Sequence, residues 1–80
     1  MKNLIKRKKK KILVLGSNPE TYDLIKTINN EGYLSYVIGM EKVSKTKKIA
    51  YKSFIGDGSN YEHVKGLIHK YNIDAVMCGT

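Results

Sequence analysis

A strand, a turn and a helix in succession, residues 11–32 (KILVLGSNPETYDLIKTINNEG), constrain the fold of this chain more than any other stretch. The unbroken apolar run at residues 12–15 ends at Gly16, a pattern typical of a strand that is buried on both faces of a parallel sheet. After this turn, the pattern predicts a helix over residues 19–31 that ends at Gly32. The turn would direct the first free N–H groups and the positive dipole end of the helix at one point, where an anion or a phosphate could be held.

The basic residues are concentrated at the N-terminus. The 80-residue chain has a net charge of +8, but residues 1–11 carry seven Lys and Arg side chains and no acid, whereas the rest carries eight basic and seven acidic side chains. Such a run is usually a solvated arm. No aromatic residue interleaves it to stack on bases, so a nucleic-acid partner is not expected. We therefore divide the chain into a basic arm, residues 1–11, and one domain, residues 12–80.

A single cysteine, Cys78, excludes an internal disulfide. Together with the absence of a secretion signal, it predicts a reducing, cytoplasmic setting. The apolar run at residues 12–15 is too short for the core of a signal peptide or for a membrane span, so no membrane partner is expected. Because Cys78 falls in a predicted buried strand, we expect a small apolar core residue rather than a nucleophile.

Three further apolar runs predict strands at residues 33–39, 53–55 and 73–78, the middle one short and near the sheet edge. A polar segment with a short helical turn around residues 46–51 precedes the short strand, and a second helix precedes the last strand. This order predicts an α/β fold, a Rossmann-like half with a parallel sheet of about four strands and helices on its faces. The first strand should be central, between the second and the fourth.

Both predicted helices carry capping signals at their N-termini. The first is capped either by Asn18 or by Ser17, which would form a Ser-x-x-Glu capping box with Glu20. The second repeats this signature as Ser59-x-x-Glu62. Its inward-facing residues are predicted to be Tyr61, Val64, Leu67 or Ile68, and Tyr71.

The carboxyl ends of the strands form the edge at which sheets of this type bind ligands. We expect the crevice where the first and fourth strands diverge. It would lie between Gly16, Ser17 and Asn18 at the end of the first strand and Cys78, Gly79 and Thr80 at the end of the fourth.

The turn after the first strand lacks most of the dinucleotide fingerprint G-x-G-x-x-G. Asn18 and Thr21 stand at the positions of the second and third glycines, and Glu20 would place a negative charge near an incoming phosphate. These departures argue against NAD or FAD held in the usual way. Glu41 lies about where an acidic ribose partner would sit, but with the glycines missing we interpret it as a solvated loop acid.

Metal-ligand spacing is absent from the sequence. His63 and His69 lie on the predicted second helix without sharing a face, and no cysteine or carboxylate pattern completes a site, so both are interpreted as surface histidines. No Ser-His-Asp set or carboxylate pair stands out either, and no catalytic residue or metal is assigned.

Four segments resemble the N-terminal, pre-ATP-grasp domain of ATP-grasp ligases, the superfamily of biotin carboxylase, carbamoyl phosphate synthase and the purine-pathway ribonucleotide ligases. They are residues 10–20 (KKILVLGSNPE), 32–40 (GYLSYVIGM), 44–62 (SKTKKIAYKSFIGDGSNYE) and 72–80 (NIDAVMCGT). The resemblance implies an ATP-dependent carboxylate–amine or carboxylate–thiol ligase that acts through an acyl-phosphate. In such enzymes this first domain binds no ATP, and its loops after the first and fourth strands face the second substrate, here through residues 16–18 and 79–80.

The resemblance also implies that the catalytic parts lie elsewhere. It places the ATP clamp and the Mg²⁺ carboxylates beyond residue 80, so this domain would hold no cofactor and would be a fragment of a longer enzyme or a truncated product. Its partner would be the rest of the ligase chain or a second copy, because the fourth strand would keep an open edge and an uncovered face.

Two other functions remain open from the sequence. One is a regulatory nucleotide-binding module similar to the potassium-channel RCK domains, which also have a Gly-Asp pair after a later strand, as at Gly56 and Asp57. The other is a nucleic-acid adaptor that binds through the basic arm.

Overall fold

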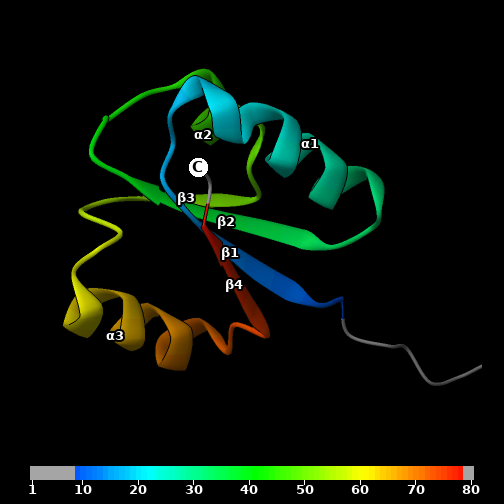
Figure 1. Ribbon diagram of the computed structural model, residues 1–80. Coiled ribbons are helices and arrows are strands. Elements are labelled where there is room, and N and C mark those ends of the chain that lie inside the picture. Colours follow the sequence, from blue (N-terminus) through cyan, green and yellow to red (C-terminus); the bar gives the residue numbers. More distant parts are fainter. Residues whose placement is uncertain (1–8, 79–80) are drawn as a thin grey trace, which may run out of the picture.

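A computed structural model describes residues 9–78 as a four-stranded sheet with helices on both faces (Figure 1). All strand pairs are parallel and the strand order is β3-β2-β1-β4. The predicted α/β, Rossmann-like fold is confirmed, with the first strand central between the second and the fourth. The elements are β1 (Lys11–Leu15), the 3₁₀ helix η1 (Pro19–Thr21), α1 (Tyr22–Asn30), β2 (Leu34–Gly39), α2 (Lys45–Ile49), β3 (Lys52–Ile55), α3 (Tyr61–Tyr71) and β4 (Ala75–Cys78).

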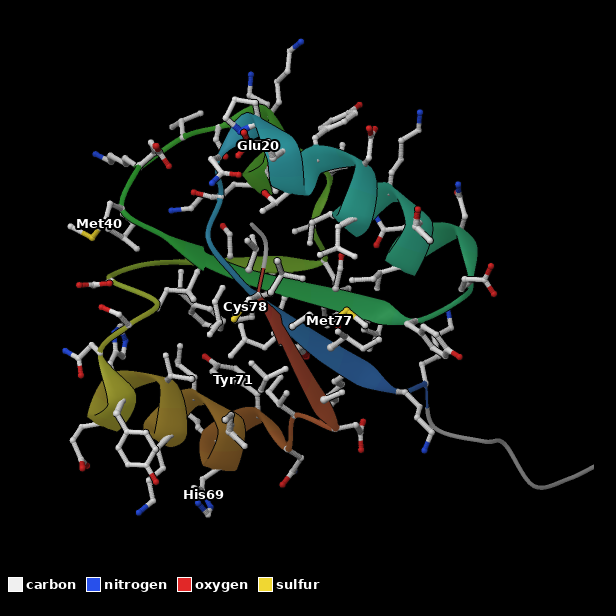
Figure 2. All side chains as sticks on the ribbon, viewed as in Figure 1. Glu20, Met40, His69, Tyr71, Met77 and Cys78 are labelled. Atoms are coloured by element: carbon white, nitrogen blue, oxygen red, sulfur yellow. The ribbon has the colours of Figure 1, made fainter. Side chains whose placement is uncertain are left out.

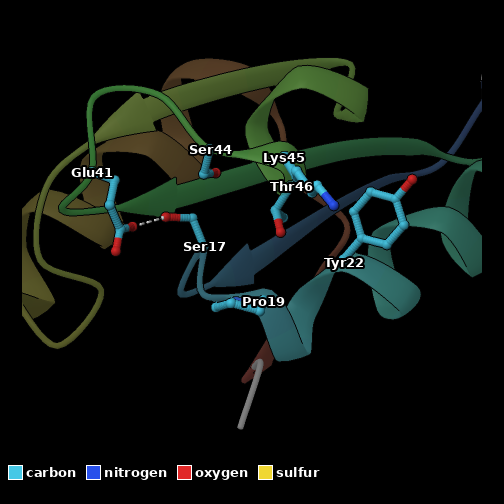
Figure 3. Close-up of a pocket in the computed structure, with 7 residues that line it drawn as sticks. All are labelled: Ser17, Pro19, Tyr22, Glu41, Ser44, Lys45 and Thr46. Carbon is cyan, nitrogen blue, oxygen red and sulfur yellow. Dashed lines mark hydrogen bonds between the residues drawn. The ribbon is translucent and has the colours of Figure 1, made fainter.

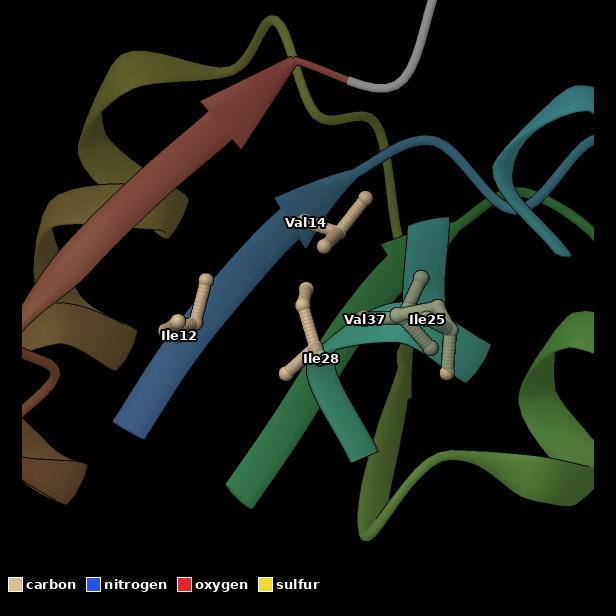
Figure 4. Packing of buried hydrophobic residues seen from close by; sticks show 5 residues of the cluster. All are labelled: Ile12, Val14, Ile25, Ile28 and Val37. Carbon is tan, nitrogen blue, oxygen red and sulfur yellow. The ribbon is translucent and has the colours of Figure 1, made fainter. Parts of the chain in front are cut away.

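The two faces of the sheet are covered by different helices. Successive residues of a strand point to opposite faces, so β1 supplies side chains to both layers of the core. On one face, Ile25 and Ile28 of α1 pack on Val14 and Val37 (Figure 4), and α1 and α2 lie on the same side of the sheet (Figure 1). The other face packs against α3. Its buried residues are Leu13, Tyr36, Ile38, Val64 and Leu67.

One of the two capping predictions is confirmed at the start of the first helix. Asn18 is the N-cap residue and Pro19 the first helical residue, although the Asn18 side chain makes no capping hydrogen bond. The Ser17 hydroxyl donates to the Glu41 carboxylate and does not form a capping box with Glu20. The Ser17 hydroxyl bonds to Glu41, which is 24 residues further along the chain. A local sequence pattern does not show such a long-range contact.

The end of the first helix is as predicted. Gly32 has φ +88°, the left-handed conformation that a side chain would oppose. The N–H of Gly32 donates to the Asn29 carbonyl (3.0 Å) and the N–H of Tyr33 to the Ile28 carbonyl (3.1 Å). This pair of bonds is the Schellman motif, which satisfies the last free carbonyls of α1 and turns the chain into β2.

The second long helix begins one residue later than its Ser-x-x-Glu signature predicts. Asn60 is the cap, since its side chain accepts from the N–H of His63 (3.1 Å), whereas Ser59 bonds to the Asp57 carboxylate. Val64 and Leu67 are buried as predicted. Tyr61 is 69% exposed, so the prediction that it faces inward is wrong. The first turn of α3 does not bury this residue, although it follows the periodicity of the helix.

β4 is an edge strand, and all four of its residues are exposed. The open edge and uncovered face expected for the fourth strand are confirmed within the described part of the chain. Val76 and Met77 are each 41% exposed. Cys78, expected in the core, is exposed as well, at the end of this edge strand (Figure 2).

The amino ends of β1 and β4 are held together by paired bonds. The N–H of Lys11 donates to Asp74 Oδ2 (2.7 Å), and the N–H of Asp74 donates to the Lys11 carbonyl (2.8 Å). Lys11 is therefore the first residue of the sheet, whereas the rest of the predicted basic arm lies largely outside the described residues. None of the helices over residues 9–78 is long and apolar enough to cross a membrane.

Candidate functional site

The turn after β1 lies directly against the end of β2. Gly16 has φ +110°, and its N–H donates to the Ile38 carbonyl (2.7 Å). At Gly39 there is no room for a side chain, because a β-carbon would overlap the Ser17 hydroxyl and stand 2.9 Å from the Ser17 backbone nitrogen. The absence of a side chain at Gly39 thus lets the two carboxyl ends meet.

Asn18 is fixed through its backbone. Its carbonyl accepts from the N–H of Thr21 (3.0 Å), from the Thr21 hydroxyl (2.7 Å) and from the Thr46 hydroxyl (3.2 Å). Its side-chain Oδ1 is buried and has no hydrogen-bond partner among the described residues. A buried acceptor of this kind is uncommon in folded proteins, and a donor from a bound molecule would satisfy it.

Ser17 and Glu41 form the second polar contact of the site. The Ser17 hydroxyl, itself buried, donates to Glu41 Oε1 (2.7 Å). This bond, more than any other interaction, lowers the pKa of the Glu41 carboxyl, and the nearby Lys47 ammonium acts in the same direction. Glu41 therefore stays ionised at neutral pH and presents an acceptor.

The buried Lys47 side chain bonds to the backbone of the segment between β2 and α2. It is 7% exposed, and its Nζ donates to the Gly39 carbonyl (2.9 Å) and to the Glu41 carbonyl. Burial lowers the pKa of the Lys47 ammonium, and the charge of Glu41 partly offsets this. A buried lysine bound to two carbonyls fixes the backbone on which Glu41 is carried.

A cavity of about 430 Å³ opens beside these contacts, and we call it the Glu41 cavity. Figure 3 shows Glu41 and Ser17 at one end and Tyr22 at the other, with Ser44 and Thr46 between them. Its lining residues are Ser17, Pro19, Tyr22, Glu41, Ser44, Lys45 and Thr46. The volume falls in the range of small-molecule sites, and the lining combines one carboxylate and three aliphatic hydroxyls with an aromatic ring.

The predicted site is only partly within the described residues. Gly16, Ser17 and Asn18 lie at the carboxyl end of β1, as expected, while Gly79 and Thr80 lie outside the described part. Leu15 pairs with Cys78, so β1 and β4 are adjacent and parallel up to the crevice.

Sequence reasoning missed most of the cavity. Glu41 was interpreted as a solvated loop acid; it is exposed, yet it binds Ser17 and lines the cavity. Ser44 and Thr46 received no role. Ser44 caps α2 by accepting from the N–H of Lys47 (3.0 Å), a Ser-x-x-Lys start that carries no acidic partner to mark it.

The histidines lie apart from the site. His63 and His69 are exposed on α3, and the His63 ring lies next to Gly56. Within residues 9–78, no group of three or more His, Cys, Asp or Glu side chains could hold a metal ion.

No protein-family model and no curated protein sequence matches this chain. Among solved structures, it is similar to glycinamide-RNase-transformylase T from Mycobacterium tuberculosis, with a TM-score of 0.78 and 17% sequence identity. The match covers 89% of this chain and 20% of that chain. The chain therefore shares the fold of a segment one fifth the length of a larger protein.

Proposed function

We propose that this chain is the N-terminal, substrate-side domain of an ATP-grasp carboxylate–amine or carboxylate–thiol ligase. The observation that carries the proposal is the structural match, because nearly the whole chain superposes on one fifth of a transformylase that is related to the ATP-grasp enzymes. The sequence segments that resemble pre-ATP-grasp domains support the same assignment.

In this proposal the domain binds the second, small-molecule substrate through the turn after β1. Asn18 Oδ1 accepts a hydrogen bond from the substrate, which supplies the donor that the buried oxygen lacks among the described residues. Gly16 and Ser17 shape the turn, and Gly79 and Thr80, which lie outside the described residues, are assigned to the same substrate. The location of the protein would be cytoplasmic.

The domain catalyses nothing by itself in this proposal. ATP and Mg²⁺ bind in grasp domains outside this chain, which form its partner, and a homo-oligomer is the alternative partner. The exposed β4 supports such a partner, because a strand with a free edge and apolar side chains is a pairing surface.

The test is steady-state kinetics on the complete gene product, with phosphate release from ATP as the readout. We expect release to require a carboxylate and an amine or thiol substrate. Asn18→Leu should raise the KM for the second substrate about tenfold, the loss of one buried hydrogen bond, and leave the KM for ATP unchanged. The matched control is Asn30→Leu at the exposed end of α1. Absence of ATP-dependent release, or equal changes in both KM values, would refute the proposal.

A further inference from the structure

Five lysines gather at the edge of the sheet where the strands begin. Because all four strands are parallel, their amino ends lie at one edge, opposite the carboxyl ends that carry the turn after β1 and the Glu41 cavity. We call it the basic edge. Its lysines come from the start of β1, the start of β3 and the end of α3, and they are Lys9, Lys10, Lys11, Lys52 and Lys70.

Tyr71, the last residue of α3 (labelled in Figure 2), brings three of these lysines together. The Nζ of Lys11 donates to the Tyr71 carbonyl (2.9 Å). The Nζ atoms of Lys52 and Lys70 each lie 5.6 Å from the centre of the Tyr71 ring. The ring itself packs 5.9 Å from the Tyr36 ring in the core, which fixes its position. Three positive charges from three elements are therefore held around one side chain.

A cavity of about 290 Å³ lies at the same edge. Its lining residues are Lys9, Lys10, Lys11, Asn72 and Asp74. The acids described at this edge are Asp74, whose carboxylate accepts from the N–H of Lys11 (2.7 Å), and Glu31 at the end of α1. Five lysines thus face two carboxylates, and the basic edge attracts anions.

The sequence extends this positive charge. Residues 1–8 add three lysines and one arginine directly before Lys9. So many basic side chains exceed what a single phosphate can pair with. They match a polyanion that carries a phosphate at every unit.

An exposed aromatic ring accompanies the charges. Tyr51 directly precedes Lys52 at the start of β3, and it is 62% exposed although its ring lies 5.6 Å from the Tyr36 ring. The basic run at residues 1–11 contains no aromatic residue, but the fold places Tyr51 at the same edge from a distant segment. An exposed ring beside phosphate-binding charges can stack on an unpaired base, which single-stranded nucleic acid offers and a duplex does not.

The exposed hydrophobic residues favour this partner over an anionic membrane. At the basic edge they are Tyr51 and Tyr33, and Tyr33 is placed there because the next residue donates its N–H to the Lys10 carbonyl (2.9 Å). The exposed aliphatic side chains of residues 9–78 lie in β4 or at the carboxyl ends of β2 and β3. They are Met40, Val43, Ile55, Val76 and Met77. A membrane-binding surface would need such anchors beside its lysines.

We propose that the basic edge binds single-stranded nucleic acid, with its phosphates on the lysines and a base stacked on Tyr51. The five residues of β1, about 16 Å of strand, separate this surface from the turn that carries the proposed ligase substrate. The two sites share no residue, so the inference does not rest on ligase activity.

The test is fluorescence anisotropy of labelled uridine and deoxythymidine oligomers of about 12 nucleotides, titrated with the 80-residue chain. We expect saturable binding that weakens as salt is added. Saturation by the uridine oligomer alone identifies RNA as the partner, and saturation by the deoxythymidine oligomer alone identifies DNA.

The aromatic contribution is tested at Tyr51. Tyr51→Ala should weaken binding about tenfold, and Tyr51→Phe, which keeps the ring, should bind like the wild type. Tyr61→Ala is the control, because Tyr61 is also exposed and has the Nζ of Lys65 5.8 Å from its ring, but lies at the other end of α3. It should leave the affinity unchanged.

The charge contribution is tested with two double variants of equal net charge. Lys52→Gln with Lys70→Gln should reduce the slope of log K against log salt by about 1.4, because two phosphate contacts are lost. Lys26→Gln with Lys65→Gln, two exposed lysines that also lie near tyrosine rings but away from the basic edge, should not change it. Circular dichroism checks that each variant is folded.

Three results would overturn the inference. The first is no saturable binding of either oligomer at about 50 mM salt. The second is an equal effect of each variant and its control, which would assign binding to net charge alone. The third is binding to phosphatidylserine vesicles without binding to the oligomers, which would identify a membrane as the partner.

Discussion

Ser17 rests directly on Gly39, so closely that a β-carbon on Gly39 would stand 2.9 Å from the Ser17 backbone nitrogen and overlap its hydroxyl. The two residues belong to the ends of neighbouring parallel strands, and Ser17 continues from this contact to the Glu41 carboxylate. The position of the candidate site relative to the sheet therefore depends on Gly39, which has a hydrogen atom in place of a side chain.

Gly39→Ala should destabilise the protein by about 1–3 kcal/mol, because the added methyl group must displace the turn after β1. The measurement is the free energy of unfolding from urea denaturation monitored by circular dichroism. Gly66→Ala is the matched control. Gly66 lies within α3 and a β-carbon there meets nothing within 4 Å, so alanine should stabilise the helix by roughly 0.5–1 kcal/mol. Equal effects at the two glycines would contradict the close contact.

Lys47→Met should cost about 2 kcal/mol, because the carbonyls of Gly39 and Glu41 lose a charged donor while the side-chain volume is kept. Lys48→Met, at the next and exposed position, is the control and should change stability by less than about 0.5 kcal/mol. Thermal and urea unfolding of both variants would measure the difference. A wild-type stability in Lys47→Met would show that the buried ammonium does not hold this segment.

Acid should remove the contribution of Glu41 to stability. Its pKa is lowered in the folded protein, chiefly by the hydrogen bond from Ser17, so the folded state favours the ionised form. This contribution is present above the ordinary glutamate pKa and is lost as the pH falls through the lowered folded value. The stability difference between the wild type and Glu41→Gln should therefore be constant near neutral pH and disappear at low pH. A difference that grows on acidification would have the wrong sign.

The isolated chain should self-associate through β4, whose apolar residues and free edge are exposed. Met77→Lys should shift sedimentation equilibrium toward the monomer, because a charge would have to be buried in the contact. Tyr61→Lys is the control, since Tyr61 is also an exposed hydrophobic residue but lies on α3. If both variants associate like the wild type, the contact lies elsewhere.

The turn after β1 could be predicted because it depends on a local sequence pattern, and the strand order because it follows general rules of topology. An apolar run ending at Gly16 specifies a buried strand, and Gly32 specifies the left-handed residue that ends α1. The pairing of β1 with β4 follows from the strand order of a mononucleotide-binding half and needs no side-chain detail. These features depend on neighbouring residues or on general topology.

The contact of Ser17 and the cavity could not be predicted, because each depends on contacts between distant residues. The Ser17 hydroxyl had two possible partners, Glu20 and Glu41. It bonds to Glu41 because β1 and β2 lie side by side in the sheet. The exposure of Tyr61 was missed for a related reason. Helical spacing shows which residues share a face, but it does not show how much of that face the sheet covers.

β1 is synthesised well before β4, one of its two neighbours in the sheet. Lys11 and Asp74, whose bonds align β1 with β4, are 63 residues apart. A nascent chain on the ribosome would therefore expose one side of β1 until β4 had emerged. The loss of chain entropy on closing so long a loop precedes the contacts between β1 and β4 that offset it. Folding is therefore slow for a chain of this size. During that interval the unpaired side of β1 would be the natural target of a chaperone.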